Sequence, residues 1–284
     1  MEPVREDADL TRPDIVGGVI ALVQRAKISW APILATLGIV VALGVVWVLL
    51  TSLGGASSAP AYRWDFSTVG PYLGFLMEGL KLTLGITVVS IALGMFLGIC
   101  VAMARMSSIA LLRTAVTLYV EIMRGTPALV QLVWVYYALP IVTGIQLPAF
   151  ESVILAFSLN LGAFYGEAFR SGIQAIPREQ VETADVLGLS YLQRMRFVIV
   201  PQAFRIVLPV LISIGISMFK DTSLVSTLGV SDLMYDGRTV ATATYRPLEI
   251  FTAVAIIYFI VAFPVTIIMR RYEIYLSRHL AQTK

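Results

Sequence analysis

The residues best suited to bind another molecule stand in one polar loop between two hydrophobic stretches. The loop reads Glu182-Thr183-Ala184, three further residues, Gly188, and nine residues leading to Val198-Ile199-Val200-Pro201. A helix-forming stretch, a glycine and a proline at this spacing predict a short helix that stops and a chain that returns into an apolar segment. A plain connector needs only to be polar and long enough. The loop is therefore predicted to be a folded contact for a partner.

Two carboxylates, Glu121 and Asp221, are the acidic residues that could bind a coupling ion within a membrane. Each has a basic neighbour, Arg124 three residues on and Lys220 directly before. Because Glu121 and Arg124 fall on one helical face, the sequence predicts an ion pair that lowers the cost of both charges. No convincing internal repeat accompanies them. An ion gradient is thus a weaker candidate for the energy source than a separate subunit that supplies energy to the chain.

Catalytic and nucleotide-binding motifs are missing. No lysine is preceded by glycine and followed by serine or threonine, so the chain has no GxxxxGK[ST] phosphate-binding loop. No Gly-x-Ser-x-Gly or His-Glu-x-x-His motif occurs. With His279 as the only histidine and Cys100 as the only cysteine, the sequence offers neither a His/Cys zinc site nor a disulfide. We expect no catalytic residue, no metal site and no cofactor on this chain.

The composition indicates an all-α integral membrane protein. The 284 residues are 58% hydrophobic and 14% charged, which exceeds the roughly half-apolar usage of globular chains. Several apolar runs approach the ~20 residues that cross a ~30 Å hydrocarbon core. The basic residues alternate between loops and form no single patch, so no nucleic acid partner is expected.

Six transmembrane helices are expected, together with a short cytoplasmic helix in the polar loop. The third is too long for one straight crossing, and Pro127 is predicted to kink or divide it. Gly94-x-x-x-Gly98 in the second permits close approach of a neighbouring helix. The predicted spans are 30–51, 80–104, 110–139, 150–169, 203–220 and 249–269.

The distribution of Lys and Arg predicts the orientation. With the N-terminus inside, most of the 21 basic residues fall on the inner side, as the positive-inside rule requires. Both termini are then cytoplasmic, with tails over 1–29 and 276–284, and so is the 170–202 loop. The outer side receives Arg63, Lys81, Arg238 and Arg246, while Arg124 and Lys220 lie within or near the membrane.

The polar loop resembles the EAA signature of ABC-importer permeases, commonly written EAA-x3-G-x9-I-x-LP. Thr183, Val198 and Val200 depart from it with little change in size. The resemblance covers about residues 72–275, a core of five helices, so the 30–51 helix is an addition. Further blocks narrow the resemblance to permeases for polar amino acids of the histidine/glutamine type: Arg124-Gly125-Thr126-Pro127, Glu167-x-x-Arg170-x-Gly172-Ile173, Lys220-Asp221-Thr222-Ser223-Leu224 and Thr244-Tyr245-Arg246-Pro247.

The resemblance implies a transport subunit, not an enzyme, in the bacterial cytoplasmic (inner) membrane. It would belong to an ATP-driven importer of a polar amino acid, with ATP and magnesium bound by a separate subunit. The implied partners are two copies of a cytoplasmic ABC ATPase, a second permease that is identical or homologous, an extracytoplasmic amino-acid-binding protein, the substrate and membrane lipid.

The same resemblance makes the polar loop a coupling helix that docks on the ATPase. Residues 178–187 favour helix, Pro177 suits its first turn, and Gly188 offers the positive φ with which helices stop. Val181, Ala184 and Val186 with Leu187 form an expected apolar stripe, and Ser190 is expected to cap the next turn. The implied coupling residues are Glu182, Thr183, Ala184, Gly188 and Pro201. The alternative is an amphipathic interfacial loop with solvated charges.

The substrate path is expected to include Lys220, Asp221, Thr222 and Ser223, whose opposite charges and hydroxyls could hold an amino acid. A buried pair and hydroxyls closing a helix break are the competing interpretation. Asn160 and Tyr165 are weaker candidates for the path, because residues five apart do not share a helical face cleanly.

A gate or hinge beside the path is expected at Glu121, Arg124, Gly125, Thr126 and Pro127, with simple packing of a kinked helix as the alternative. Two other functions stay open at this point. One is an autonomous ion-coupled secondary transporter that uses Glu121 or Asp221, and the other is a membrane scaffold or sensor without transport.

Overall fold

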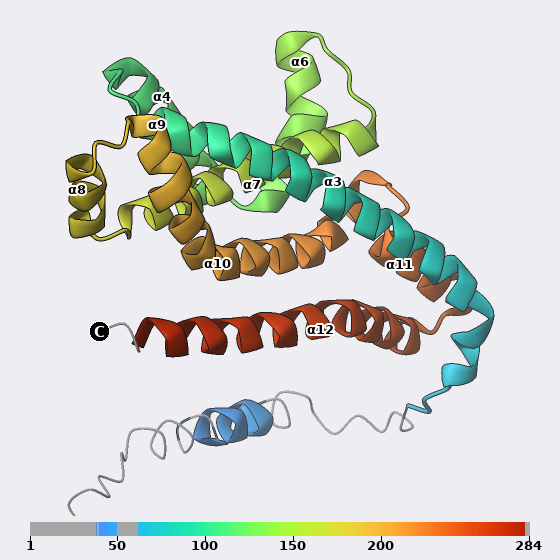
Figure 1. The fold of residues 1–284 in the computed structure, drawn as a ribbon. Helices are drawn as coiled ribbons and strands as arrows, with labels where there is room; N and C mark the ends of the chain where they lie inside the picture. The colour runs from blue at the N-terminus through green and yellow to red at the C-terminus, as the bar shows by residue number, and fades with distance from the viewer. Residues whose placement is uncertain (1–37, 39, 50–61, 282–284) are drawn as a thin grey trace, which may run out of the picture. The chain divides into compact units, whose positions relative to one another are not determined.

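The computed structural model describes residue 38 and residues 40–49 and 62–281, with side chains up to residue 272. Every regular element in these ranges is helical (Figure 1), which confirms the all-α class. The chain forms two compact units, which divide after Arg63. In the first unit, Val40–Leu49 is an apolar helix. The rest of the predicted 30–51 span lies outside the described residues, apart from residue 38.

The second unit contains four helices that are long and apolar enough to cross a membrane. The span that begins at Phe66 opens with two short 3₁₀ helices, η1 (Phe66–Thr68) and η2 (Gly70–Tyr72). The four principal helices are α3 (Leu73–Arg105), α7 (Ala149–Gln174), α10 (Val200–Asp221) and α12 (Pro247–Ala281). They match the predicted spans 80–104, 150–169, 203–220 and 249–269, and each extends beyond the prediction.

Two helices that meet at a sharp bend are the candidate for a fifth crossing. α4 (Ala110–Gly125) and the helical run Ala128–Thr143 are both apolar but meet at 110°. The bend falls at Thr126-Pro127, where both residues adopt extended backbone, so the predicted division at Pro127 is confirmed. The run consists of α5 (Ala128–Val133), η3 (Trp134–Ala138) and α6 (Leu139–Thr143). The described residues thus hold four spans, or five if the bent pair is one span.

Shorter helices connect the spans at either end. α8 (Arg178–Val186), α9 (Tyr191–Arg194) and η4 (Met195–Ile199) lie between α7 and α10. η5 (Thr222–Leu228) and α11 (Leu233–Thr244) lie between α10 and α12. Because α7 and α12 run from the α11 end toward the α8 end while α10 runs back (Figure 1), these two groups of short helices occupy opposite ends of the unit.

The α3–α7 contact is the most extensive between long helices. A Cβ atom on Gly98 would stand 2.6 Å from Cβ of Tyr165, and one on Gly94 would overlap Leu161. A glycine of α7 likewise makes room for α3, because a Cβ on Gly166 would overlap Val101. Real Cβ atoms do not approach so closely, so both helices need glycine there. The close approach that Gly94-x-x-x-Gly98 permits is present, although the weak motif favoured ordinary packing as the interpretation.

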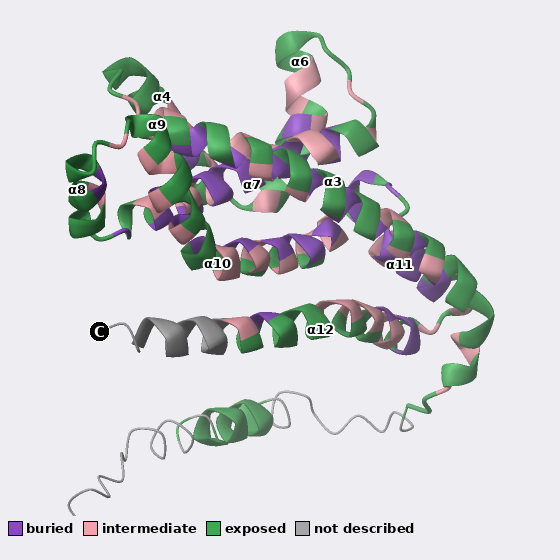
Figure 2. Ribbon diagram, in the orientation of Figure 1, coloured by how far each residue is buried: buried purple, intermediate pink, exposed green. Residues whose placement is uncertain are grey.

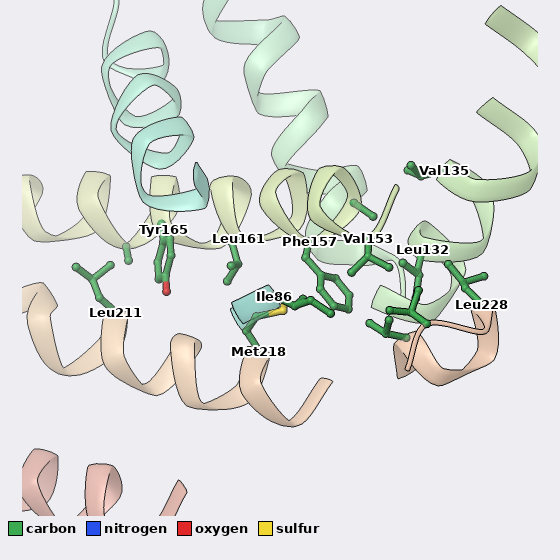
Figure 3. Close-up of a cluster of buried hydrophobic side chains, with 14 of the residues drawn as sticks. Ile86, Leu132, Val135, Val153, Phe157, Leu161, Tyr165, Leu211, Met218 and Leu228 are labelled. Atoms are coloured by element: carbon green, nitrogen blue, oxygen red, sulfur yellow. The ribbon is translucent and has the colours of Figure 1, made fainter. Parts of the chain in front are cut away.

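Buried apolar side chains fill the space that α3, α5, α7 and α10 share. Figure 3 shows Phe157, Leu161 and Tyr165 pointing from α7 toward α10, where they meet Leu211 and Met218. Leu132 of α5 extends the same cluster toward η5. These residues are nearly inaccessible, so the cluster fixes the relative positions of the helices that carry the predicted path residues.

α12 contributes little to this core. Only 11% of its most apolar window is buried, against 61% for α7, and Figure 2 shows the part over 247–272 mostly exposed or half-buried. Phe259 and Phe263 stack on each other on the exposed surface. In a membrane, such a surface contacts lipid or another subunit.

Replacing Gly94 by Ala is expected to lower the thermal unfolding midpoint of the detergent-purified chain, because overpacking of a filled contact costs about 1–3 kcal/mol. Gly85→Ala on the same helix is the matched control, since a Cβ there meets nothing within 4 Å and alanine favours helix by up to about 1 kcal/mol. Equal midpoints for the two variants would contradict the close packing of α3 on α7.

Candidate functional site

α8 begins at the predicted residue 178 and ends at Val186, one residue before the predicted end. Pro177 is the N-cap with extended ψ of 136°, one position before the helix, so the prediction of Pro177 inside the first turn is wrong by one residue. The helix stops at Gly188, whose φ is +73°. The N–H of Leu189 donates to the carbonyl of Ala184 at 3.1 Å, a bond typical of a glycine-terminated helix. Gly188 is therefore a backbone requirement.

The apolar face that α8 packs against its own subunit contains fewer residues than predicted. Ala184 is buried, and Val181 packs against a cluster formed by Ile176, Ile199 and Ala203. Val186 and Leu187 are 88% and 73% exposed, so their place in the apolar stripe is wrong. Val186 stands two residues beyond Ala184 and thus projects from nearly the opposite side of the helix. Leu187 follows the last helical residue.

The outer face of α8 is open to a partner. Glu182 is exposed, and Thr183 donates its hydroxyl to the carbonyl of Glu179 at 2.7 Å. A shallow groove of about 310 Å³ runs along the helix between residues of its first turn and the returning chain. Its lining residues are Glu179, Gln180, Thr183, Ala184, Leu187, Leu189 and Val198. The exposed apolar side chains of Val186 and Leu187, together with the exposed carboxylate of Glu182, suit contact with another protein.

Polar contacts hold the segment that leads from α8 through α9 back toward α10. The Ser190 hydroxyl accepts from the N–H of Gln193 at 3.4 Å, and the Gln193 side chain accepts from the N–H of Ser190 at 2.9 Å. This capping box confirms the predicted cap. Asp185 of α8 forms an ion pair with Arg194 of α9, which the sequence did not reveal. The two short helices are thereby tied together.

Pro201 sits immediately after a π-helical turn. The N–H of Val200 donates to the carbonyl of Met195, five residues back. A proline has no N–H, and its ring would clash with the carbonyl four residues earlier, that of Phe197. Widening the turn to a π helix removes that clash. The same arrangement recurs at Pro140, which follows the π turn closed by Leu139 on Trp134.

An ionic cluster joins α3 to α7 near their α8 ends. Glu167 of α7 forms ion pairs with Arg105 of α3 and with Arg170, whose Nη2 is 2.5 Å from Oε1. Arg170 also donates to Gln174 at 2.6 Å. All three charged side chains are at most one quarter exposed. The sequence analysis named Glu167 and Arg170 as part of a motif and assigned no ion pair to them. Spacing could not identify Arg105, which lies 62 residues from Glu167.

The predicted ion pair between Glu121 and Arg124 is wrong. Both side chains are exposed, and no ion pair joins them in the described part of the chain. Arg124 instead lies over the ring of Phe164 on α7, 5.5 Å from its centroid. A cation over an aromatic face gains attraction without desolvating a carboxylate.

The break at Thr126-Pro127 is held by a buried amide network. Nε2 of Gln131 donates to the carbonyls of Met123 and Thr126 at 2.8 and 3.0 Å and to the Thr126 hydroxyl at 2.8 Å. Asn160 of α7 donates to Oε1 of Gln131 at 3.0 Å. The carbonyls at the end of α4 are thus satisfied from two other helices. Gly125 and Pro127 are exposed beside it.

Gln131 is the site residue that the sequence reading missed. It is 9% exposed within an apolar segment, and a lone glutamine there was the available signal, because a polar side chain buried among apolar helices must find a partner.

The path candidates do not converge on one cavity. Tyr165 lines an apolar cavity of about 280 Å³ between α3, α10 and α12, and Asn160 is not among the residues that line it. Thr222 is buried and donates to the carbonyl of Phe219 at 2.7 Å, while Lys220 is exposed and Asp221 half-buried. Residues 220–223 do not break the helix, which continues as the 3₁₀ helix η5. A fully buried Lys220–Asp221 pair is therefore not present.

Two buried carboxylates lie in α11 or at its start, at the end of the unit opposite α8. Asp232 caps α11 by accepting from the N–H of Tyr235 at 2.9 Å, and the hydroxyl of Tyr258 donates to it at 3.5 Å. Asp236, one turn on, is 2% exposed and its Oδ1 has no hydrogen-bond partner. Burial raises the pKa of each of these two carboxyl groups to about 6. Gly79 of α3 provides the space for Asp236.

Residues 90–274 match the family described as binding-protein-dependent transport system inner membrane component. The chain is 34% identical over 209 residues to the arginine transport system permease protein ArtQ of Bacillus subtilis (strain 168), covering 74% of this chain and 95% of ArtQ. It is 34% identical over 212 residues to the glutamine transport system permease protein GlnP of Escherichia coli (strain K12), covering 74% and 97%.

Solved structures share the fold. A crystal structure of an amino acid ABC transporter with histidines aligns with a TM-score of 0.70 and 33% identity, covering 75% of this chain and 99% of that chain. The inward-facing MetNI methionine ABC transporter aligns with a TM-score of 0.58 at 21% identity, which supports the fold alone.

The raised pKa of Asp236 predicts a pH dependence of stability. The ordinary carboxyl pKa is about 3.9, so between about pH 4 and 6 the folded chain holds protons that the unfolded chain releases. The free energy of unfolding therefore falls as the pH rises through this window and levels above it. Asp236→Asn should flatten this decline and raise the thermal midpoint at pH 7.

Thermal unfolding of the purified chain between pH 4 and 7 measures this effect. The exposed Glu151 provides the control substitution Glu151→Gln, which should leave the pH profile of the parent unchanged. A pH profile for Asp236→Asn that coincides with the parent would contradict a buried, protonated carboxyl group at this position.

Proposed function

The chain belongs to the family of binding-protein-dependent transport system inner membrane components, and from that premise we propose that it imports a polar amino acid in an ATP-driven complex. As a family member it is a multi-pass membrane permease subunit of an ABC amino acid importer and not an enzyme. The proposal of a polar substrate is supported by relatives named for arginine and glutamine.

Coupling to a separate ATPase is proposed to take place at α8. The single observation that carries this proposal is the form of α8: a short helix, stopped by Gly188 at φ +73° and exposed on its outer face. It projects from one end of the unit, apart from the long helices (Figure 1). In that role Glu182 contacts the ATPase, and the ion pair between Asp185 and Arg194 transmits the displacement of α8 to α9 and α10.

Two permease subunits are proposed to enclose the path. The exposed surface of α12 and the exposed residues at the α4–α5 break support a second copy or a homologue. Closure of an ATPase dimer would draw the two α8 helices together and open the path outward, and hydrolysis would reset it. Loaded binding protein favours the outward-open form, since a ligand shifts states only through differential affinity.

The proposed orientation places both termini and α8 in the cytoplasm. The basic residues of the described part support it: Arg105, Arg170, Arg178, Arg194 and Arg196 gather at the α8 end. Orientation matters to the proposal because ATP is available on that side only.

Reconstitution into liposomes tests the transport class. The chain with its ATPase and binding protein should accumulate a polar amino acid only when ATP is present on the α8 side. Uptake driven by an ion gradient through the chain alone would replace the proposal with the ion-coupled carrier. Absence of transport in both conditions would favour a scaffold or sensor.

Glu182→Lys and Gly188→Val are expected to reduce ATP-driven uptake at least ten-fold while membrane insertion persists. The first reverses a charge on the docking face, and the second forces a β-branched residue into a left-handed conformation. Glu182→Gln and Gly188→Asn are the matched controls, because the amide keeps the shape and asparagine tolerates positive φ. ATP hydrolysis that continues without uptake is the expected signature, and normal uptake in both variants would refute docking at α8.

Asp221→Asn tests whether the half-buried carboxylate contacts substrate. If it does, the relative uptake of cationic and neutral amino acids should shift by about an order of magnitude, since a hydrogen bond to a charged group contributes about 1.5–3 kcal/mol. Competition assays with arginine and glutamine in the same liposomes measure this ratio. An unchanged ratio would favour packing, with Asp221 serving only the α10–η5 junction.

A further inference from the structure

Asp236 of α11 is a buried carboxyl group without a partner. The residue is 2% exposed, and its Oδ1 atom has no hydrogen-bond partner. In the described part of the chain, no ion pair reaches it either. Buried polar atoms are nearly always paired, and an isolated carboxylate removed from water takes up a proton rather than remain charged. The position therefore favours a protonated Asp236.

A second carboxyl group lies one turn before it. Asp232 is fully buried. It accepts from the N–H of Tyr235 at 2.9 Å and from the hydroxyl of Tyr258 at 3.5 Å. Two negative charges one helical turn apart repel each other, which raises the cost of ionising both. The pair therefore holds a proton more tightly than an exposed carboxyl group does.

The pair lies in the contact that α11 makes with α3. A Cβ atom on Gly79 of α3 would stand 2.5 Å from Oδ2 of Asp236 and 3.0 Å from the backbone carbonyl oxygen of Asp232. A Cβ atom on Gly237 would stand 2.6 Å from a methyl group of Val254 on α12. α11 is thus packed closely against both long helices. An ionised Asp236 gains contact with water only if α11 separates from α3.

The charged groups of the surrounding elements do not neutralise the pair. Three cations are engaged with other groups: Lys81 with Glu78, Arg246 with Glu249, and Arg238 with the hydroxyl of Ser226. Glu249 is itself buried and accepts from the N–H of Asp65 at 3.0 Å. Lys220, at the end of α10, is exposed beside Asp221. Neutralisation of the pair is thus left to protons.

The packing of α11 on α3 is linked to pH through this pair. Burial raises the pKa of both carboxyl groups to about 6, whereas a carboxyl group in water has a pKa of about 3.9. Packed α11 therefore keeps protons that separated α11 would release. The packing is strongest below about pH 4 and weakens as the pH rises to about 6, above which the loss is complete.

We propose that Asp232 and Asp236 form a proton-binding site through which acidity outside the cell controls the packing of α11. This inference rests on the proposed function, which places α11 on the outer side and makes uptake the consequence. Arg238 joins α11 to η5, the helix that carries the path candidates Thr222 and Ser223. A bound proton holds α11 on α3 and thereby opposes rearrangement of the outer end. Acid outside the cell slows uptake.

The accessibility of Val240 measures the packing of α11. Val240 is 2% exposed, whereas its neighbour Thr239 is exposed. Because Cys100 is the only cysteine, Cys100→Ser provides a background for Val240→Cys and for Thr239→Cys as the reference. Both are labelled with a membrane-impermeant maleimide in the assembled importer in lipid nanodiscs.

The ratio of the two labelling rates cancels the pH dependence of thiol reactivity. It should rise roughly ten-fold or more from about pH 4.5 to about pH 7, since each unit of difference in pKa corresponds to a factor of ten.

Asp236→Asn keeps the shape of the side chain but cannot ionise, so the ratio should stay low at every pH. Asp232→Asn preserves the N-cap and should weaken the pH dependence. Glu78→Gln is the matched control and should keep the parent profile, because Glu78 is an exposed carboxylate one residue before Gly79. A flat profile in the parent, or a parent-like profile in Asp236→Asn, would overturn the proton site. Thermal unfolding at pH 5 checks folding, and Asp232→Asn decides alone if Asp236→Asn does not fold.

Uptake tests the consequence for transport. Proteoliposomes hold ATP at constant pH on the α8 side, while the outer pH is lowered from about 7 to about 5 with the amino-acid-binding protein present. Parent uptake divided by Asp236→Asn uptake should fall toward one, and any effect of pH on the binding protein cancels in this quotient. An unchanged quotient would overturn the regulatory role. No ATP-dependent accumulation at any pH would refute the proposed function, whereas the labelling profile tests the proton site independently of transport.

Discussion

The close contact between α3 and α7 is the interaction on which the rest of the unit depends. Lipid tails are as apolar as leucine, so helices in a membrane associate through close packing and buried hydrogen bonds rather than through exclusion of water. Gly94, Gly98 and Gly166 allow the two backbones to approach. That approach brings Glu167 within reach of Arg105. The same helix α7 carries Asn160 to the α4–α5 break, so one contact positions both polar networks.

Local signals in the sequence could be interpreted correctly because their causes are local. Gly188 and Ser190 end and begin helices through bonds to residues three to five positions away, and Pro127 breaks α4 through its own ring. The errors arose where a partner lies far along the chain. Glu121 and Arg124 have suitable spacing for an ion pair, yet Phe164 of another helix offered Arg124 a better contact.

The misassigned face of α8 has a local cause. Val186 and Leu187 are apolar and were grouped with Ala184 for that reason, but a residue two positions on projects from nearly the opposite side of a helix, and Leu187 follows the last helical residue. Gln131 escaped notice because an isolated amide has no motif; its meaning emerges only when Met123, Thr126 and Asn160 surround it. A buried polar residue in an apolar helix is nonetheless a signal, since it must be satisfied by another element.

The two ends of the unit differ in how their short elements are held, and this difference bears on motion. At the α8 end, α8, α9 and the π turn before Pro201 are joined by one capping box and one ion pair, with an apolar cluster on one side only. At the other end, α11 is buried against α3 and α12 by Leu233, Val240 and Ile250. A displacement of α8 therefore meets less packing resistance than one of α11. In the proposed coupling, movement that begins at α8 would be carried by α7 and α10 toward the more extensively packed α11 end.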